Sequence, residues 1–229
     1  MGINYHTPSE CGQPSTPRKW RADRKFIPTE IYGKDQDLDK IGWQAGYSIS
    51  VACPRAEHKC ADCESPSVHV GALVVAVDGT CRSTPQVWGP SAIGVYFAKD
   101  SPWNVVKRRN KPIATSQTAE LQACMAALEM AAIIKEKTLE QELSQIIIKA
   151  HSDYVCKGMT DWTAKWARNG WKNAKGLPVA NGELFQEVEM KIRDLNEMGV
   201  EILFWQVTRS QNQDAENLAN SAFDGIRRP

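Results

Sequence analysis

The chain contains 229 residues, and its 28 Lys and Arg residues nearly balance its 27 Asp and Glu residues, which gives a formal charge of +1. Hydrophobic residues make up 42% and charged residues 24% of the chain, a globular composition that excludes intrinsic disorder throughout. The near-neutral balance excludes a polybasic binder of the histone type, but it permits one basic face beside an acidic pocket.

The first 66 residues contain six prolines and few regularly spaced apolar residues. This texture predicts a loosely structured N-terminal arm over residues 1–66, followed by a folded domain over residues 67–229. Apolar side chains such as Phe26 and Trp43 would pack the arm on the domain.

The arm also contains four candidate zinc ligands, which are Cys53, His58, Cys60 and Cys63. The Cys-x-x-Cys pair has the spacing of one half of a tetrahedral Zn²⁺ site, which Cys53 and either His58 or His69 would complete. The alternative interpretation is a set of free thiols in a surface loop.

Strands and helices are predicted to alternate in the domain. A Val-rich run at 69–77 predicts a strand buried on both faces, and further strands are predicted at 91–97, 103–106, 146–151 and 200–207. Helical spacing of apolar residues predicts a helix capped by Thr115 or Ser116 and a helix capped at Ser152. It also predicts a helix with Trp162 and Trp166 that ends near Asn169, and helices around 184–195 and 215–223. This order predicts an α/β fold with a mixed sheet.

Four polar residues occupy the ends of these elements: Asp78 closes the first strand, Glu120 lies early in the long helix, His151 closes the fourth strand, and Glu216 lies early in the last helix. Because strand ends and helix starts converge on one crevice in such sheets, we expect the four side chains to meet. Clustered carboxylates repel one another unless cations lie between them, and two Mg²⁺ ions held there can hydrolyse a phosphodiester. Taken singly, each acidic residue could instead belong to a turn or complement a helix dipole.

Seven motifs follow in order along the domain: VVAVDGTC around Asp78, GVYF at 94–97, TSQTAELQA around Glu120, HSDYVCKGMTDW from His151, WARNGWK at 166–172, PVAN at 178–181 and NQDAENLA around Glu216. In this order and spacing, residues 68–225 resemble a type 1 ribonuclease H of the eukaryotic or fungal kind. The resemblance implies a five-stranded mixed sheet flanked by helices, and two-metal hydrolysis of the RNA in an RNA/DNA hybrid.

The catalytic set departs from the family pattern. At the place where the resembling family has Thr-Asp-Ser, this chain has Ala150, His151 and Ser152, so an imidazole replaces a metal-binding aspartate. Glu216 likewise replaces the last aspartate of the family pattern. Asp78, Glu120 and Glu216 remain as candidate ligands, but Mg²⁺ prefers oxygen to imidazole. We therefore predict weak or absent Mg²⁺ binding and cleavage, with His151 paired to Asp78 or Glu216 instead.

Two alternatives would preserve cleavage. His151 could accept a softer ion such as Mn²⁺ or Zn²⁺, which would give an enzyme with an altered metal demand. Asp153 could also swing into the site, although its place at a helix start should point it elsewhere.

Aromatic and basic residues alternate from Trp162 to Lys175, with no acidic side chain after Asp161. Such a pattern is typical of a surface that follows a phosphate backbone, although the buried face of a helix would also explain the tryptophans. The resemblance assigns contacts to seven residues: Tyr154, Trp162 and Trp166 in a DNA-strand channel, Thr115 and Asn181 on a DNA phosphate, and Ser116 and Gln117 near the RNA 2′-hydroxyls.

No apolar run reaches the roughly 20 residues that a membrane helix needs, and the first residues lack the apolar core of a signal peptide. Seven scattered cysteines, an odd number, fit a reducing compartment. We therefore expect an intracellular protein, nuclear or cytoplasmic, without a membrane partner.

Three functions follow from these features. The first is a ribonuclease H-like protein that binds nucleic acid, as hybrid or duplex, with lost or impaired cleavage. The second is an active hybrid endoribonuclease, and the third is a protein-interaction scaffold whose groove is vestigial. No protein partner or oligomeric state follows from the sequence.

Overall fold

A computed structural model describes residues 5–6, 20–34, 41–52, 68–69, 71–82, 89–109, 115–137 and 143–224. The candidate zinc ligands lie outside these ranges, so the predicted zinc site stays a prediction: Cys53, His58, Cys60 and Cys63.

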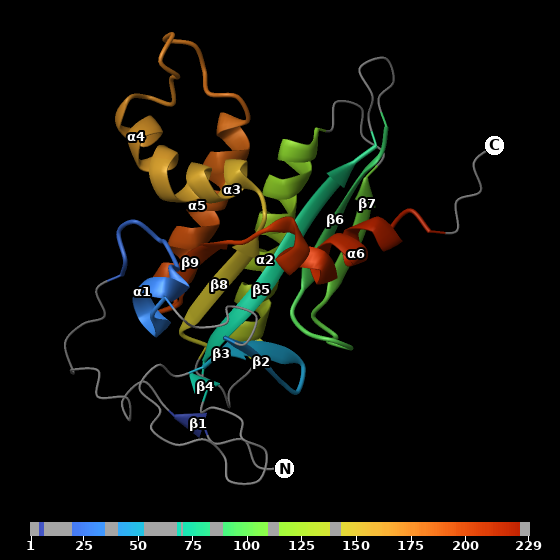
Figure 1. The fold of residues 1–229 in the computed structure, drawn as a ribbon. Coiled ribbons are helices and arrows are strands. Elements are labelled where there is room, and N and C mark those ends of the chain that lie inside the picture. Colours follow the sequence, from blue (N-terminus) through green and yellow to red (C-terminus); the bar gives the residue numbers. More distant parts are fainter. Residues whose placement is uncertain are drawn as a thin grey trace.

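The predicted five-stranded mixed sheet flanked by helices is confirmed (Figure 1). In space its strands follow the order β7, β6, β5, β8, β9, in which the β5–β8 and β8–β9 pairs are parallel and the other two are antiparallel. The third strand begins two residues later than predicted. The bounds are β5 Ala72–Cys81, β6 Ser91–Tyr96, β7 Val105–Arg109, β8 Gln145–Ala150 and β9 Glu201–Gln206.

The arm adds two strands that the sequence analysis did not predict. β2 (Gly42–Ala45) and β3 (Ser48–Val51) form an antiparallel hairpin, and β3 pairs with β5 through Ile49 and Val74. Within the described residues the sheet therefore contains seven strands, because the hairpin occupies the part of the β5 edge that β6 leaves free. A separate parallel pair joins β1 (Tyr5–His6) to β4 (Val68–His69).

The predicted helices are present, with one local change. A π-helical turn, η2, lies between α3 and α4, where Gly158 packs against Phe185 so closely that a Cβ would lie 2.3 Å from the ring. Within the described ranges, no helix is both long and apolar enough to cross a membrane. The bounds are α1 Pro28–Tyr32, α2 Ser116–Lys137, α3 Asp153–Lys157, η2 Gly158–Trp162, α4 Thr163–Arg168, α5 Gly182–Glu197, the 3₁₀ turn η3 Arg209–Asn212, and α6 Gln213–Ser221.

The sheet carries an apolar core on each face. Alternate side chains of β5, such as Val75, face α2 and α5, whereas Val74 belongs to a second cluster on the opposite face. Helix α6 crosses the sheet in front of β5 and β6, and α2 lies behind it (Figure 1). Strand β5 is thus buried on both faces, as its Val-rich sequence predicted, and its last residues lie between two helices.

Candidate active site and nucleic-acid interface

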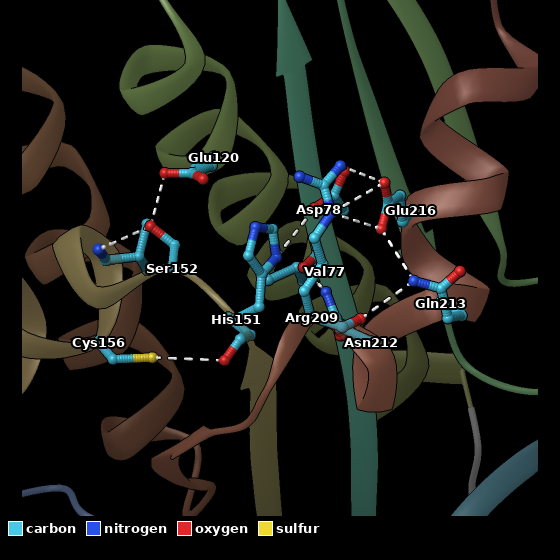
Figure 2. Close-up of polar contacts among 12 residues, drawn as sticks. Val77, Asp78, Glu120, His151, Ser152, Cys156, Arg209, Asn212, Gln213 and Glu216 are labelled. Carbon is cyan, nitrogen blue, oxygen red and sulfur yellow. Dashed lines mark hydrogen bonds and ion pairs between the residues drawn. The ribbon is translucent and has the colours of Figure 1, made fainter.

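Two glycines allow helices to approach the end of β5 closely. A Cβ at Gly79 would lie 2.1 Å from the Glu120 backbone nitrogen, and a Cβ at Gly94 would lie 2.4 Å from the Ala215 carbonyl oxygen. Without side chains at these positions, α2 brings Glu120 and α6 brings Glu216 toward Asp78 (Figure 2).

Asp78 lies at the centre of this group and is only 4% exposed. Burial raises the pKa of Asp78 to about 6; the charges of Glu216 and Glu120 add to this effect, whereas those of His151 and Arg209 oppose it. Its Oδ1 atom is buried and accepts no hydrogen bond from the described residues. Keeping the Asp78 carboxylate ionised therefore costs free energy, and its Oδ1 atom is available as an acceptor.

His151 follows the last residue of β8 and lies against Asp78. Its Nδ1 atom is 3.2 Å from Oδ1 of Asp78, and its side chain is 23% exposed. This is an ion-pair distance, but the contact is not aligned as a hydrogen bond. The structure thus places the imidazole beside Asp78, one of its two predicted partners.

Glu120 is held by a residue that the sequence analysis treated only as a helix cap. The Ser152 hydroxyl donates to Oε2 of Glu120 at 2.5 Å, and its oxygen also accepts from the backbone nitrogen of Val155 at 3.3 Å. Burial raises the pKa of Glu120, and the Ser152 hydrogen bond opposes that shift. Ser152 therefore connects the start of α3 to the acidic group.

Glu216 is held by Arg209, which the sequence analysis did not identify. The Arg209 Nε atom lies 3.1 and 3.0 Å from the two carboxylate oxygens, its Nη2 atom also donates to Oε1, and Gln213 Nε2 donates to Oε2 at 3.1 Å. The hydrogen bond from Arg209 is the main reason why the pKa of Glu216 is lowered. Arg209 lies in the 3₁₀ turn that precedes α6, so no helical spacing in the sequence indicates this pair.

These side chains do not fit a centre for two Mg²⁺ ions. Both oxygens of Glu216 accept hydrogen bonds from Arg209 and Gln213, and an imidazole rather than a carboxylate lies beside Asp78. As the side chains lie, no three His, Cys, Asp or Glu residues within the described ranges are grouped to hold an ion. The Arg209 guanidinium instead supplies positive charge next to Glu216.

Asp153 does not take the place of the missing aspartate. Its Oδ2 atom pairs with Lys157 Nζ at 2.5 Å, Oδ1 accepts from Gln206, and the side chain is 61% exposed. The expectation that Asp153 points elsewhere is confirmed, and its side chain does not restore the missing aspartate.

An aromatic group forms beside the acidic one. The ring of Trp162 lies 6.2 Å from that of Tyr154 and 5.6 Å from that of Trp166, and Phe185 supports Tyr154 and Trp166 from the core. The Tyr154 hydroxyl donates to the Ala180 carbonyl and accepts from Asn181, each at 3.1 Å. Both tryptophans are half-buried, so each keeps part of its ring accessible.

The remaining predicted contact residues lie at the exposed start of α2. Thr115 caps the helix, since its hydroxyl oxygen accepts from the Thr118 backbone nitrogen at 3.1 Å, and Ser116 and Gln117 follow it. They occupy the turn before Glu120. The structure therefore brings the predicted acidic residues together at one end of the sheet and places these residues on the helix that carries Glu120.

The RNase H family model matches residues 71–223, and with the fold described above this shows that the chain belongs to the ribonuclease H family. The described sheet and helices form its type 1 ribonuclease H-like domain.

Individual relatives cover this domain. The ribonuclease H of Marinobacter nauticus is 33% identical over 119 residues, which are 52% of this chain and 72% of the relative. Human ribonuclease H1 is 34% identical over 117 residues, 51% of this chain and 38% of that protein. Among solved structures, LC11-RNase H1 in complex with an RNA/DNA hybrid is 19% identical, with a TM-score of 0.45 over 66% of this chain and 96% of that one.

Proposed function

We propose that this chain binds RNA/DNA hybrids and that its Mg²⁺-dependent cleavage is weak or absent. The observation that carries the proposal is the imidazole of His151, 3.2 Å from the buried carboxylate of Asp78. This position belongs to an oxygen ligand in the family pattern. Loss of a carboxylate leaves a two-Mg²⁺ centre short of both an oxygen donor and a negative charge.

The neighbouring charges support the same proposal. Arg209 holds Glu216, and Ser152 holds Glu120, so two of the three remaining carboxylates already have hydrogen-bond partners. A cation that recruited them would have to displace these contacts as well as tolerate the imidazole. Even indirect changes around a metal site commonly cost about 10- to 100-fold in affinity or activity, so these combined changes should cost at least that.

The aromatic group supports binding without cleavage. Trp162 and Trp166 present partly exposed rings, and Lys165 and Arg168 lie exposed on the same helical segment. Rings next to cations suit a nucleic-acid strand, because bases or sugars stack on the rings while phosphates meet the charges. Relatives named ribonuclease H make RNA/DNA hybrid the first ligand to test.

A second candidate function is Mn²⁺-dependent cleavage of hybrids. It is favoured by the Oδ1 atom of Asp78, a buried oxygen that accepts no hydrogen bond from the described residues and lies next to an imidazole nitrogen. Mn²⁺ accepts mixed oxygen and nitrogen ligands more readily than Mg²⁺ does.

The test compares the unmodified chain with His151→Asp in a hybrid-cleavage assay containing Mg²⁺ or Mn²⁺. We expect His151→Asp to increase the Mg²⁺-dependent rate at least about 10-fold. His151→Asn is the matched control, because it supplies an oxygen without the charge, and it should give a smaller gain. Asp78→Asn in the His151→Asp background should abolish the gained cleavage.

Each other outcome selects a different function. Efficient Mg²⁺-dependent cleavage by the unmodified chain would refute the impairment, and cleavage in Mn²⁺ alone would establish the second candidate. Hybrid binding is measured separately in EDTA at low salt. If hybrid, duplex and single strands all fail to bind there, the protein-interaction scaffold becomes the better interpretation.

A further inference from the structure

Residues 21–26 of the arm, called here the edge segment, bind the outer edge of the sheet. The backbone nitrogen of Phe26 donates to the Phe204 carbonyl at 2.9 Å, and the Phe204 nitrogen donates to the Arg24 carbonyl at 2.8 Å. The Phe26 ring packs 5.4 Å from that of Trp205. The edge segment thus covers β9, an otherwise open edge strand, although it lies outside the family match at 71–223.

Two consecutive side chains of the edge segment reach from this edge to different helices. The Arg24 guanidinium makes a bidentate pair with Glu189 of α5 at 2.5 and 2.9 Å. The Lys25 ammonium lies 2.6 Å from Oδ1 of Asp161 in η2. The edge segment is therefore joined to β9, α5 and η2, three elements that are far from it in the sequence.

Asp161 places a negative charge directly before Trp162, at the start of the aromatic and basic run. It is the only acidic residue in the run from Asp161 to Lys175, whose other charges are basic. The Lys25 hydrogen bond is the main reason why the pKa of Asp161 is lowered, and the carboxylate is therefore ionised at neutral pH. Without Lys25, the carboxylate would keep the hydrogen bond from the Thr160 hydroxyl at 3.1 Å and the weaker charge interaction with Lys165, but it would lose its ion-pair partner beside a surface that must attract phosphates.

We infer that Lys25 is a positioning residue for nucleic-acid binding: it neutralises Asp161 and fixes η2, so that the Trp162 face meets a phosphate backbone without a repelling carboxylate. The inference rests on the proposed function and extends its site to a residue outside the ribonuclease H domain. It also explains why a basic side chain of the arm points toward η2.

A direct contact between Lys25 and a phosphate would also weaken binding when Lys25 is removed, so the test must separate the two roles. If Lys25 acts through Asp161, removing both charges should restore affinity. If Lys25 binds phosphate itself, the loss should persist in the double variant. A Lys25→Arg variant preserves the charge and should preserve affinity in either case.

The experiment measures the Kd for an RNA/DNA hybrid by fluorescence anisotropy at low salt in EDTA, with the full 229-residue chain. We expect Lys25→Ala to bind about fivefold more weakly, the scale of a partly exposed charge pair. Asp161→Asn should bind at least as tightly as the unmodified chain, and Lys25→Ala/Asp161→Asn should return to within about twofold of it. Lys34→Ala, which removes a different lysine of the arm, is the control for net charge.

Amide hydrogen exchange of residues 158–168 gives a second readout that needs no nucleic acid. We expect faster exchange in Lys25→Ala than in Lys34→Ala, because η2 loses its anchor. Unchanged exchange and unchanged affinity in Lys25→Ala would each overturn the inference, and so would a double variant as weak as Lys25→Ala. An unmodified chain that fails to bind hybrid would instead overturn the proposed function, and the exchange experiment would still decide whether Lys25 positions η2.

Discussion

The carboxyl group of Asp78 is buried between Glu120 and Glu216, and burial raises its pKa to about 6 from the ordinary 3.8. Between these two values the folded chain keeps a proton that the unfolded chain has lost. The folded state therefore binds more protons in this window, so the free energy of unfolding falls as the pH rises from about 4 to about 6. Above that window the ionised carboxylate lowers the free energy of unfolding by an amount that no longer changes with pH.

Asp78→Asn removes this buried charge at nearly constant volume. In a chelating buffer at pH 7.5 we expect the variant to be more stable than the unmodified chain by about 2 to 3 kcal/mol, and the difference should shrink toward zero near pH 4. Urea unfolding across this pH range measures it, with Asp194→Asn on the exposed side of α5 as the control. Equal stability of the two chains at pH 7.5 would show that Asp78 carries no such cost.

Arg209 offers a test of the charge balance around Glu216. Its side chain is 69% exposed, yet it binds both oxygens of that carboxylate. In Arg209→Gln the carboxylate loses the Arg209 hydrogen bonds and keeps the one from Gln213, and a competing positive charge is removed, so Mn²⁺ should bind about tenfold more tightly. Calorimetric titration with Mn²⁺ checks this, with Arg193→Gln as the matched control. Identical Mn²⁺ affinities in the two variants would show that Arg209 does not compete with the metal ion for Glu216.

The four residues at the ends of elements could be predicted from the sequence, because topology alone brings such ends together. The contacts that set their chemistry could not. The sequence places Arg209 in a loop but does not give the side-chain direction that aims it at Glu216. Ser152 was recognised as a cap because capping is local, whereas its bond to Glu120 spans 32 residues.

At the scale of elements, the site depends on how closely α2 and α6 approach the sheet. Gly94 lies in β6, where a Cβ would meet the Ala215 carbonyl at 2.4 Å, and backbone atoms cannot rotate away as a side chain can. We therefore expect Gly94→Ala to push α6 outward and to lower the free energy of unfolding by about 1 to 3 kcal/mol.

Gly182→Ala is the matched control for this substitution. Its new Cβ would lie 3.5 Å from Val179, an ordinary contact, at the start of α5. Its free energy of unfolding should not fall in the same urea titration, because alanine is favoured over glycine in a helix by up to about 1 kcal/mol. If the two variants lose equal stability, the close approach of α6 to β6 is not what makes glycine necessary at position 94.

The elements of the domain were predictable because each has a strong local signal. The Val-rich run gave β5, and helical spacing gave α2, α5 and α6. The β2–β3 hairpin was not predicted, because its strands have only four residues each with mixed polarity. Its pairing with β5 joins residues that are distant in the sequence, which no local pattern reveals. The π turn was also hidden, since Trp162 and Trp166 are four residues apart, as in a regular helix.

At the scale of the whole molecule, the arm closes the second face of the sheet. Phe26, Ile41 and Val51 of the arm are buried in one cluster with Ile147 of β8 and Leu203 of β9. The sequence analysis divided the chain at residue 66 by composition, whereas this packing crosses that point. The folded unit therefore depends on residues that precede the ribonuclease H match.

Phe26→Ala measures this dependence at one position. Because the ring is buried against Trp205, we expect its removal to lower the free energy of unfolding by about 3 to 5 kcal/mol. Tyr47→Ala, at a ring that is 58% exposed in the turn between β2 and β3, should change it by less than about 0.5 kcal/mol. Urea unfolding of both variants gives the comparison.

A chain that begins at residue 67 extends the same test to the entire arm. It would expose Val74, Ile147, Leu203 and Trp205 together, so we expect a larger stability loss than in Phe26→Ala, together with binding of the dye ANS to the uncovered face. If this shortened chain unfolds cooperatively with the free energy of the 229-residue chain and binds no dye, the arm is not part of the folded unit. The edge segment would then cover a sheet that is stable without it, and the anchoring of η2 would be its remaining structural role.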